Sequence, residues 1–157
     1  MSGSPAHILV IDDDENIRKV VCAILKDKGY EVDQAGSGGE AIAKTGQNHY
    51  DLMLVDIRLP DMEGTELLSR IHDTIPRIRK IMVTGYPTLQ NAVSAVNQGA
   101  DAYIMKPFDV EKMLCAIEEQ IEKQKLDRKF SEDRVAAFIE TRVKELEAHE
   151  SKTNELC

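Results

Sequence analysis

The chain of 157 residues carries 28 acidic and 20 basic side chains, a formal net charge of −8 at pH 7, and 42% of its residues are hydrophobic. This composition supplies enough apolar material for a core and so excludes a largely disordered chain, while the acidic balance excludes a basic footprint for DNA or RNA. The length predicts one domain of roughly 100–150 residues, with room for an extension.

The cysteines and the hydropathy pattern indicate the cellular compartment in which the protein is expected. Cys22, Cys115 and Cys157 are too widely spaced for a zinc site, and three cysteines do not form a disulfide framework, so we expect reduced thiols. No apolar run approaches the ~20 residues that span a membrane. The first residues, MSGSPAH, lack the basic and apolar regions of a signal peptide. These features predict a cytoplasmic protein that does not contact the membrane.

Strand-like and helix-like patterns alternate along the chain. Short apolar runs predict strands at 7–12, 51–56, 81–84 and 102–105, and a weaker pattern predicts one at 30–35. Between them lie helical patterns that begin at Glu15, in the GSGGE stretch at 36–40, at Gly64, at Thr88 and near Asp109. Gly29 and Gly99 stand where helix C-caps are expected.

About five strand–helix repeats in succession are typical of a doubly wound parallel sheet with helices on both faces. For five strands, the order 2-1-3-4-5 fits best, so we predict an α/β fold, a flavodoxin-like (βα)5 sandwich. In that order the first, third and fourth strands are central. Ligands of such sheets bind at the carboxyl ends of the strands, and those of the central strands meet at one edge.

Acidic residues stand at two of these strand ends. Asp12 and Asp13 follow the first strand, and Asp56 ends the third, in the stretch YDLMLVDIRLPDMEG. Three carboxylates placed close together would repel one another and raise their pKa values unless a cation neutralises them. An all-oxygen ligand set suits Mg²⁺, and Mn²⁺ is a second candidate.

Two further strand ends supply a lysine and a hydroxyl. Lys106 follows the fifth strand and can bring an ammonium to the same edge, while Thr84 ends the fourth strand beside the small Gly85. An acid, a metal, a lysine and a hydroxyl form a cradle for a phosphoryl group, because phosphoryl transfer depends mainly on positioning and charge neutralisation. With Asp56 as the nucleophile, the product would be an acyl phosphate.

Four stretches that carry these residues resemble a known family. ILVIDDDENIR, LMLVDIRLPDMEG, IMVTGYP and ADAYIMKPF are similar, in order and spacing, to the signatures of the receiver domain of two-component response regulators. The resemblance spans nearly all of residues 7–122. It implies a protein that accepts a phosphoryl group from a sensor histidine kinase and regulates a downstream partner by contact. It does not imply an enzyme, beyond self-phosphorylation from small donors and autodephosphorylation.

The resemblance also implies a role for each matching residue. Asp56 would be the phosphoacceptor, Asp12, Asp13, Asp56 and the carbonyl of Arg58 would hold the metal, Thr84, Gly85 and Tyr103 would form the switch, and Lys106 would bind the phosphoryl group beside a cis bond to Pro107. Phosphorylation would remodel the face formed by the fourth helix, fifth strand and fifth helix, where copies could also pair. We further expect the side chains of Arg58 and Tyr86 to flank the path of the hydrolytic water and slow dephosphorylation.

Other interpretations remain open from the residues. Asp12 to Asp14 could serve only as the N-cap of the first helix. The Asp12-x-Asp14 pattern superficially matches the nucleophile motif of haloacid dehalogenase phosphatases, and a scaffold that acts without phosphorylation is a third alternative. GSGGE lacks the Lys-Ser/Thr ending of a phosphate loop, so a helix start is expected there. The acids near 61–63 are expected in a solvated loop.

The residues beyond the fifth helix are expected to have a role separate from that of the receiver domain. We divide the chain into a flexible N-terminus (1–6), a receiver domain (7–125) and a helical extension (126–157). In the extension, Ser131 resembles the N-cap of a new helix. That helix would carry an apolar row of Val135, Phe138, Ile139, Val143 and Leu146 and fray after 148. The extension could be solvated, could dimerise, or could be a linker to an output domain that is not part of this sequence.

Overall fold

The computed structural model describes residues 5–71, 77–85, 89–107 and 109–156. The chain divides into two compact units, Met1–Gln124 and Lys125–Cys157. The first unit holds a five-stranded parallel sheet in the order β2-β1-β3-β4-β5. Its strands are β1 (His7–Ile11), β2 (Glu31–Ala35), β3 (Leu52–Asp56), β4 (Arg79–Thr84) and β5 (Ala102–Met105). This confirms the predicted fold and strand order.

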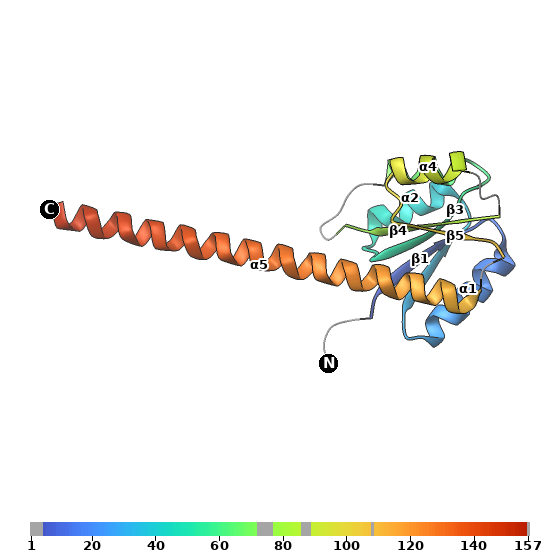
Figure 1. The fold of residues 1–157 in the computed structure, drawn as a ribbon, viewed down its shortest axis with the longest axis horizontal. Helices are drawn as coiled ribbons and strands as arrows, with labels where there is room; N and C mark the ends of the chain where they lie inside the picture. The colour runs from blue at the N-terminus through green and yellow to red at the C-terminus, as the bar shows by residue number, and fades with distance from the viewer. Residues whose placement is uncertain (1–4, 72–76, 86–88, 108, 157) are drawn as a thin grey trace. The chain divides into compact units, whose positions relative to one another are not determined.

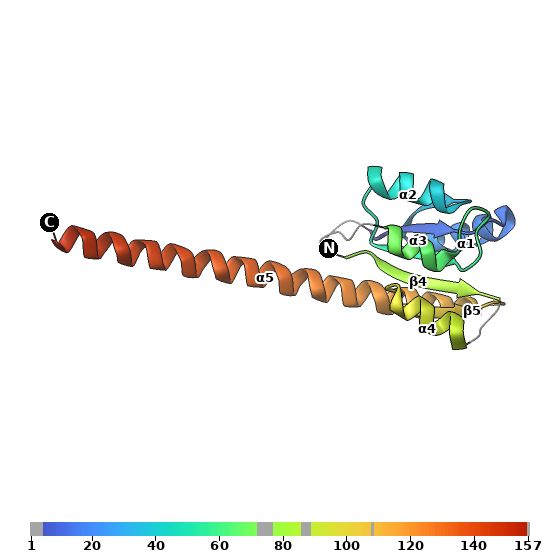
Figure 2. The ribbon, with the colours of Figure 1, turned by 90° about the horizontal axis from the view of Figure 1, so that it is seen from above.

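Helices alternate with the strands and cover both faces of the sheet. They are α1 (Glu15–Asp27), α2 (Gly38–Gln47), α3 (Gly64–Arg70), α4 (Leu89–Asn97) and α5 (Val110–Leu156). Figure 1 shows α2 and α4 on one side of the sheet and α1 on the other. Seen from above, α3 lies beside α2, and the two helices are in contact (Figure 2).

The core has two layers, one on each face of the sheet. One layer packs α2, α3 and α4 against the sheet around Tyr50, Met53 and Met82. The other packs α1 and the first turns of α5 around Leu25, Leu52 and Met113. All residues of β3 and β4 are buried, because parallel strands covered on both faces need apolar residues at successive positions.

Glycines end two helices as predicted. Gly29 after α1 and Gly99 after α4 have φ angles of +93° and +99°, a left-handed conformation that side chains disfavour. On α1, Val20 is 59% exposed, whereas Cys22 is buried against the sheet. The predicted start of α4 at Thr88 lies outside the described residues.

Two boundaries differ from the prediction by more than one residue. β4 begins at Arg79 rather than at Ile81, because Asp101 accepts hydrogen bonds from the Arg79 side chain and the Lys80 backbone. The predicted helix start at Ser131 was wrong, because α5 continues without interruption from Val110 to Leu156. This stretch contains neither glycine nor proline, so nothing in its backbone chemistry requires an end there.

Candidate functional site

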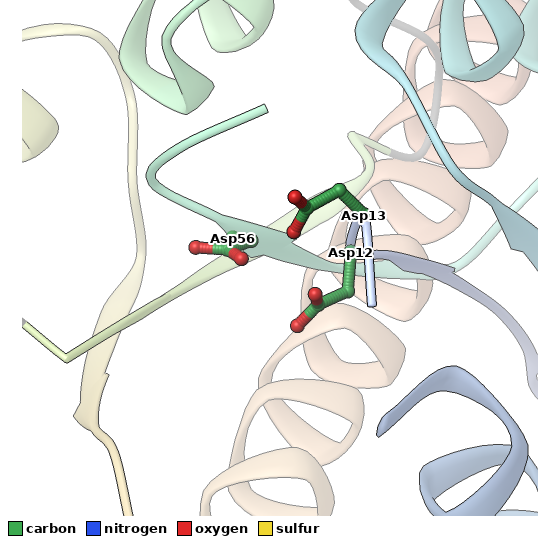
Figure 3. Close-up of side chains that lie close together, drawn as sticks. All are labelled: Asp12, Asp13 and Asp56. Atoms are coloured by element: carbon green, nitrogen blue, oxygen red, sulfur yellow. The ribbon is translucent and has the colours of Figure 1, made fainter. Parts of the chain in front are cut away.

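The register of the sheet brings the three predicted carboxylates together. Ile11 of β1 is level with Val55 of β3, so the next residues, Asp12 and Asp56, stand side by side at the end of the central strands. One carboxylate oxygen from each of Asp12, Asp13 and Asp56 lies within 4.8 Å of the others. Figure 3 shows the three side chains clustered around one space. Asp12 and Asp56 are only 4% and 8% exposed.

Lys106 reaches this cluster from the end of β5. Its Nζ donates to Asp12 Oδ2 at 2.9 Å and to Asp56 Oδ2 at 3.2 Å. Burial alone would lower the pKa of Lys106, but its hydrogen bonds and ion pairs with Asp12 and Asp56 outweigh burial and raise that pKa. The peptide bond from Lys106 to Pro107 is cis. Lys106 is therefore held as an ammonium between two carboxylates.

The Asp56 carboxylate lies in surroundings that disfavour its charge. Burial and the neighbouring charge of Asp12 raise the pKa of its carboxyl group, although the Arg58 N–H and the Lys106 ammonium act in the opposite direction. The Arg58 N–H donates to Asp56 Oδ1 at 3.2 Å. The side chain is thus fixed in orientation by two donors and excluded from most of the solvent.

Of the three consecutive acids that could cap the first helix, Asp14 is the one that does so. Its Oδ1 accepts the N–H groups of Asn16 and Ile17, so this residue forms the N-cap of α1. Asp14 therefore has a structural task that accounts for it, whereas Asp12 and Asp13 join the carboxylate cluster. This assignment also removes Asp14 from the Asp-x-Asp motif that the phosphatase alternative requires.

The three acids fit a divalent cation. Together with Lys106 they carry a formal charge of −2, and among the described residues the Asp13 carboxylate has no hydrogen bond or ion pair. Oxygen ligands of this kind suit a hard cation such as Mg²⁺. The part expected of the Arg58 carbonyl in metal binding stays a prediction.

The loop after Asp56 is held in place at both ends. Gly64 N–H donates to the Ile57 carbonyl at 2.7 Å, and a β-carbon on Gly64 would lie 2.3 Å from the Asp56 carbonyl oxygen, so only glycine fits there. Asp61 accepts the N–H groups of Gly38 and Gly39 at the start of α2. Asp61 is exposed, as expected for an acid of a solvated loop, and in addition it ties this loop to the start of α2.

The remaining predicted residues surround the same edge, with one exception. Thr84 is fully buried, and its carbonyl accepts the Lys106 N–H at 2.6 Å. Gly85 beside it is exposed. The Tyr103 ring packs against the core, and its buried hydroxyl has no hydrogen-bond partner among the described residues. Tyr86 lies outside the described residues.

Sequence reasoning missed Arg18, which lies directly behind the cluster. Its Nη1 donates to the Asp12 carbonyl at 2.7 Å and its Nε to Gln34 Oε1 at 3.0 Å. A basic residue on the first helix gives no indication of such a contact by itself. A possible indication was its place, six residues after Asp12 and on the turn of helix that faces the strand end.

Comparisons with known proteins agree with this geometry. The family model described as the response regulator receiver domain matches residues 8–118. The transcriptional regulatory protein ZraR of Klebsiella oxytoca is 36% identical over 121 residues, which are 77% of this chain and 27% of that protein. The chain thus spans about a quarter of the length of this curated relative.

Solved structures show the same fold. A CheY-like receiver domain protein from Methanospirillum hungatei JF-1 is 47% identical, with a TM-score of 0.76, and the match covers 79% of this chain and 99% of that chain. A response regulator from Burkholderia pseudomallei, solved with a phosphorylated aspartic acid and a calcium ion, is 33% identical, with a TM-score of 0.68 and coverage of 78% and 72%. The chain belongs to the response regulator receiver domain family of two-component systems.

Proposed function

We propose that this chain is a phosphorylation-activated switch in which Asp56 accepts a phosphoryl group from a sensor histidine kinase. The observation that carries the proposal is the position of Lys106 Nζ, which contacts both Asp12 and Asp56. An ammonium beside an oriented, nearly buried carboxylate can neutralise the charge of an incoming phosphoryl group. The phosphorylated aspartic acid in the Burkholderia pseudomallei relative supports the same chemistry.

The proposed step makes one bond and breaks one. A carboxylate oxygen of Asp56 attacks the phosphorus of the donor, a P–O bond forms, and the P–N bond of a phosphohistidine, or the P–O bond of a small acyl phosphate, breaks. The electron pair leaves with the donor. Lys106 pairs with the transferred oxygens, and the Arg58 N–H that contacts Asp56 Oδ1 keeps the carboxylate in its orientation. Autodephosphorylation by water reverses the modification.

Asp12, Asp13 and Asp56, together with the Arg58 carbonyl, would hold Mg²⁺ or Mn²⁺ at this edge of the sheet. The bound cation supplies charge neutralisation for the donor and acceptor oxygens, which otherwise repel one another. The Asp13 carboxylate, which has no other partner among the described residues, is available for this role.

The readout of phosphorylation involves Thr84 and Tyr103. The hydroxyl of Thr84 would move toward the phosphoryl group at Asp56, and Gly85 leaves room for that group. Tyr103 would then fill the vacated space. Its buried hydroxyl finds no hydrogen-bond partner within the described part of the chain, which makes its present position a costly one. The face of α4, β5 and the start of α5, with exposed Val93, Val96 and Met105, would contact a downstream partner or a second copy.

Two positions near the site, Arg58 and Tyr86, would set the lifetime of the phosphorylated state. Arg58 is exposed two residues after Asp56, and Tyr86 stands two residues after Thr84. Their bulk would hinder the approach of hydrolytic water. A slower loss of phosphate from an Arg58→Ala, Tyr86→Ala variant than from the wild type would contradict this part of the proposal.

The second unit supports a further role in self-association. It is a single helix, and Ala136, Ile139, Val143 and Leu146 recur along it at spacings of 3 and 4 residues, as in a coiled coil. Ile139 and Leu146 are 55% and 54% exposed. A parallel pairing of two copies would bring Arg142 of one helix near Glu147 of the other, whereas an antiparallel pairing would oppose acids. The same helix could instead lead to an output domain, as in longer regulators.

Beryllofluoride, a stable mimic of the phosphoryl group, tests the switch without a kinase. We expect it, together with Mg²⁺, to shift the backbone amide resonances of Thr84, Tyr103 and Lys106 in the wild type. In Asp56→Ala those resonances should not respond. Equal shifts in both proteins would place the binding elsewhere, and the absence of any response in the wild type would refute the switch.

A further inference from the structure

The three acids of the cluster are not held equally. The Asp12 carboxylate accepts the Asp14 N–H and the Lys106 ammonium, and the Asp56 carboxylate accepts the Arg58 N–H and the same ammonium. The Asp13 carboxylate is exposed and has no such donor within the described part of the chain. Its position depends on the backbone that carries it, above all on the peptide unit between Asp12 and Asp13.

One side chain from α1 fixes that peptide unit. Arg18 donates from Nη1 to the Asp12 carbonyl oxygen at 2.7 Å, which is the acceptor end of the Asp12–Asp13 peptide. A hydrogen bond from a charged donor is stronger than a neutral one, so it restrains the rotation of this peptide unit. Rotation of the unit would swing the Asp13 side chain away from Asp12 and Asp56.

Arg18 is itself held in orientation from β2. Its Nε donates to Gln34 Oε1 at 3.0 Å, and the guanidinium lies close against the backbone at Gly36, where an added β-carbon would be 3.1 Å from Nη1. The planar guanidinium can make both bonds at once because its donors form a rigid fork, which a lysine lacks. Gln34 and Gly36 therefore fix the direction in which Arg18 points.

We propose that Arg18 is a positioning residue for metal binding, and that Gln34 acts through it. Arg18 holds the Asp12–Asp13 peptide so that the Asp13 carboxylate stays at the cation site. The inference rests on the metal site of the proposed function. The charge of Arg18 and its positioning role predict opposite changes in Mg²⁺ affinity when Arg18 is replaced. A nearby positive charge by itself weakens the binding of Mg²⁺, so its removal would raise the affinity. Loss of the positioning contact would lower it. The sign of the change when Arg18 is replaced therefore separates the two roles.

The test is a titration of the full chain with Mg²⁺, followed by calorimetry and by the backbone amide resonances of Asp13 and Asp14. We expect Arg18→Met to weaken Mg²⁺ binding about tenfold, the lower end of the effect of removing a residue that orients a metal ligand. Arg18→Lys keeps the charge and should bind Mg²⁺ nearly as weakly. Gln34→Leu should weaken binding by a smaller factor, and adding it to Arg18→Met should change nothing further.

Lys19→Met is the matched control. It removes the same charge from the next residue of α1, where Lys19 pairs with Glu15 on the surface, and Mg²⁺ affinity should stay unchanged. Unchanged or tighter binding in Arg18→Met, with the amide resonances of the sheet intact, would overturn the inference. If Arg18→Met does not fold, wild-type affinity in Gln34→Leu would overturn it. A wild type that binds no Mg²⁺ would instead refute the metal site itself.

Discussion

The ammonium of Lys106 lies 3.2 Å from a carboxylate oxygen of Asp56, although 50 residues separate them in the sequence. The same ammonium is 2.9 Å from Asp12, so one positive charge serves two nearly buried carboxylates, with Asp13 beside them. The site therefore holds more negative charge than its own residues neutralise. Functional sites commonly lower the stability of the folded protein in this way. We therefore expect substitutions at this site to change the free energy of unfolding.

Asp56→Asn should stabilise the chain in the absence of divalent cations. Because burial and the charge of Asp12 raise the pKa of Asp56 in the folded protein, its ionised form opposes folding at neutral pH. We expect the free energy of unfolding to rise by about 1 kcal/mol at pH 7. Urea denaturation in the presence of a chelator measures it.

The stability gain of Asp56→Asn should also depend on pH in a direction that can be checked. An acid whose pKa is raised on folding destabilises the folded protein once it is ionised. This destabilisation is absent below the unfolded pKa and grows to its full size as pH rises through the folded pKa. The gain from Asp56→Asn should therefore disappear as the pH falls toward 4. Glu122→Gln, which removes an exposed charge from α5, is the control and should show no comparable gain. A lower stability of Asp56→Asn at pH 7 would contradict the account.

Gly64→Ala should destabilise the loop that carries Asp56. The new β-carbon would lie 2.3 Å from the Asp56 carbonyl oxygen and 2.9 Å from Ile57 Cα, and neither backbone atom can move freely. We expect a loss of about 3 kcal/mol in the free energy of unfolding. The control is Gly46→Ala in α2, where no atom lies within 4 Å and the helix should gain about 0.5–1 kcal/mol. Equal effects of the two substitutions in thermal denaturation would refute this explanation.

Much of the fold could be predicted because most strands contain a short apolar run and the helices between them carry apolar residues at helical spacing. The run from Leu52 to Asp56 is apolar at every position before its final acid, which is the pattern of a strand buried on both faces. The strand order then placed Asp12 and Asp56 at the same edge. The cluster of acids followed from topology, and the family resemblance identified its role.

The interactions that were missed are contacts between a side chain of one element and backbone groups of another. Arg18 and Asp61 each bind backbone groups of another element, and no periodicity reports such a contact. The interruption predicted at Ser131 was wrong for a different reason. Serine followed by acids is typical of an N-cap, but it is also tolerated inside a helix when the neighbours favour helix.

Asp61→Ala should destabilise the start of α2 because it removes the acceptor of two backbone N–H groups. Hydrogen bonds from Gly39 and Gly38 lower the pKa of Asp61 below its ordinary value of 3.8. A carboxyl group with a lowered pKa contributes stability above its unfolded pKa, and this contribution is lost as pH falls through the folded value. The difference in melting temperature from the wild type should therefore be full at pH 7 and shrink below about pH 4.

Asp61→Asn separates the two effects of this residue. The asparagine keeps one acceptor oxygen but carries no charge, so its stability should lie between those of the wild type and Asp61→Ala, with little dependence on pH in this range. An Asp61→Ala protein with the same melting temperature as the wild type at pH 7 would show that the contact is dispensable.

Ile139→Glu should abolish self-association of the extension if two copies pair through the apolar row. Ile139 is 55% exposed in the single chain and lies at a core position of the proposed coiled coil. Sedimentation should show dimers in the wild type and monomers in the variant. Phe130→Glu is the matched control, because nine residues place Phe130 on the opposite side of the helix, although it is also exposed at 63%. Monomers in the wild type at high concentration would reject the pairing.

The central claim is that Asp56 accepts a phosphoryl group in a site completed by a divalent cation. The most direct measurement is the intact mass of the chain after incubation with a small acyl phosphate and Mg²⁺, followed by mapping of the modified residue. We expect one added phosphoryl group on Asp56, with no addition when a chelator replaces Mg²⁺ or when the protein is Asp56→Asn. An unmodified wild type, or a phosphoryl group on another residue, would contradict the claim.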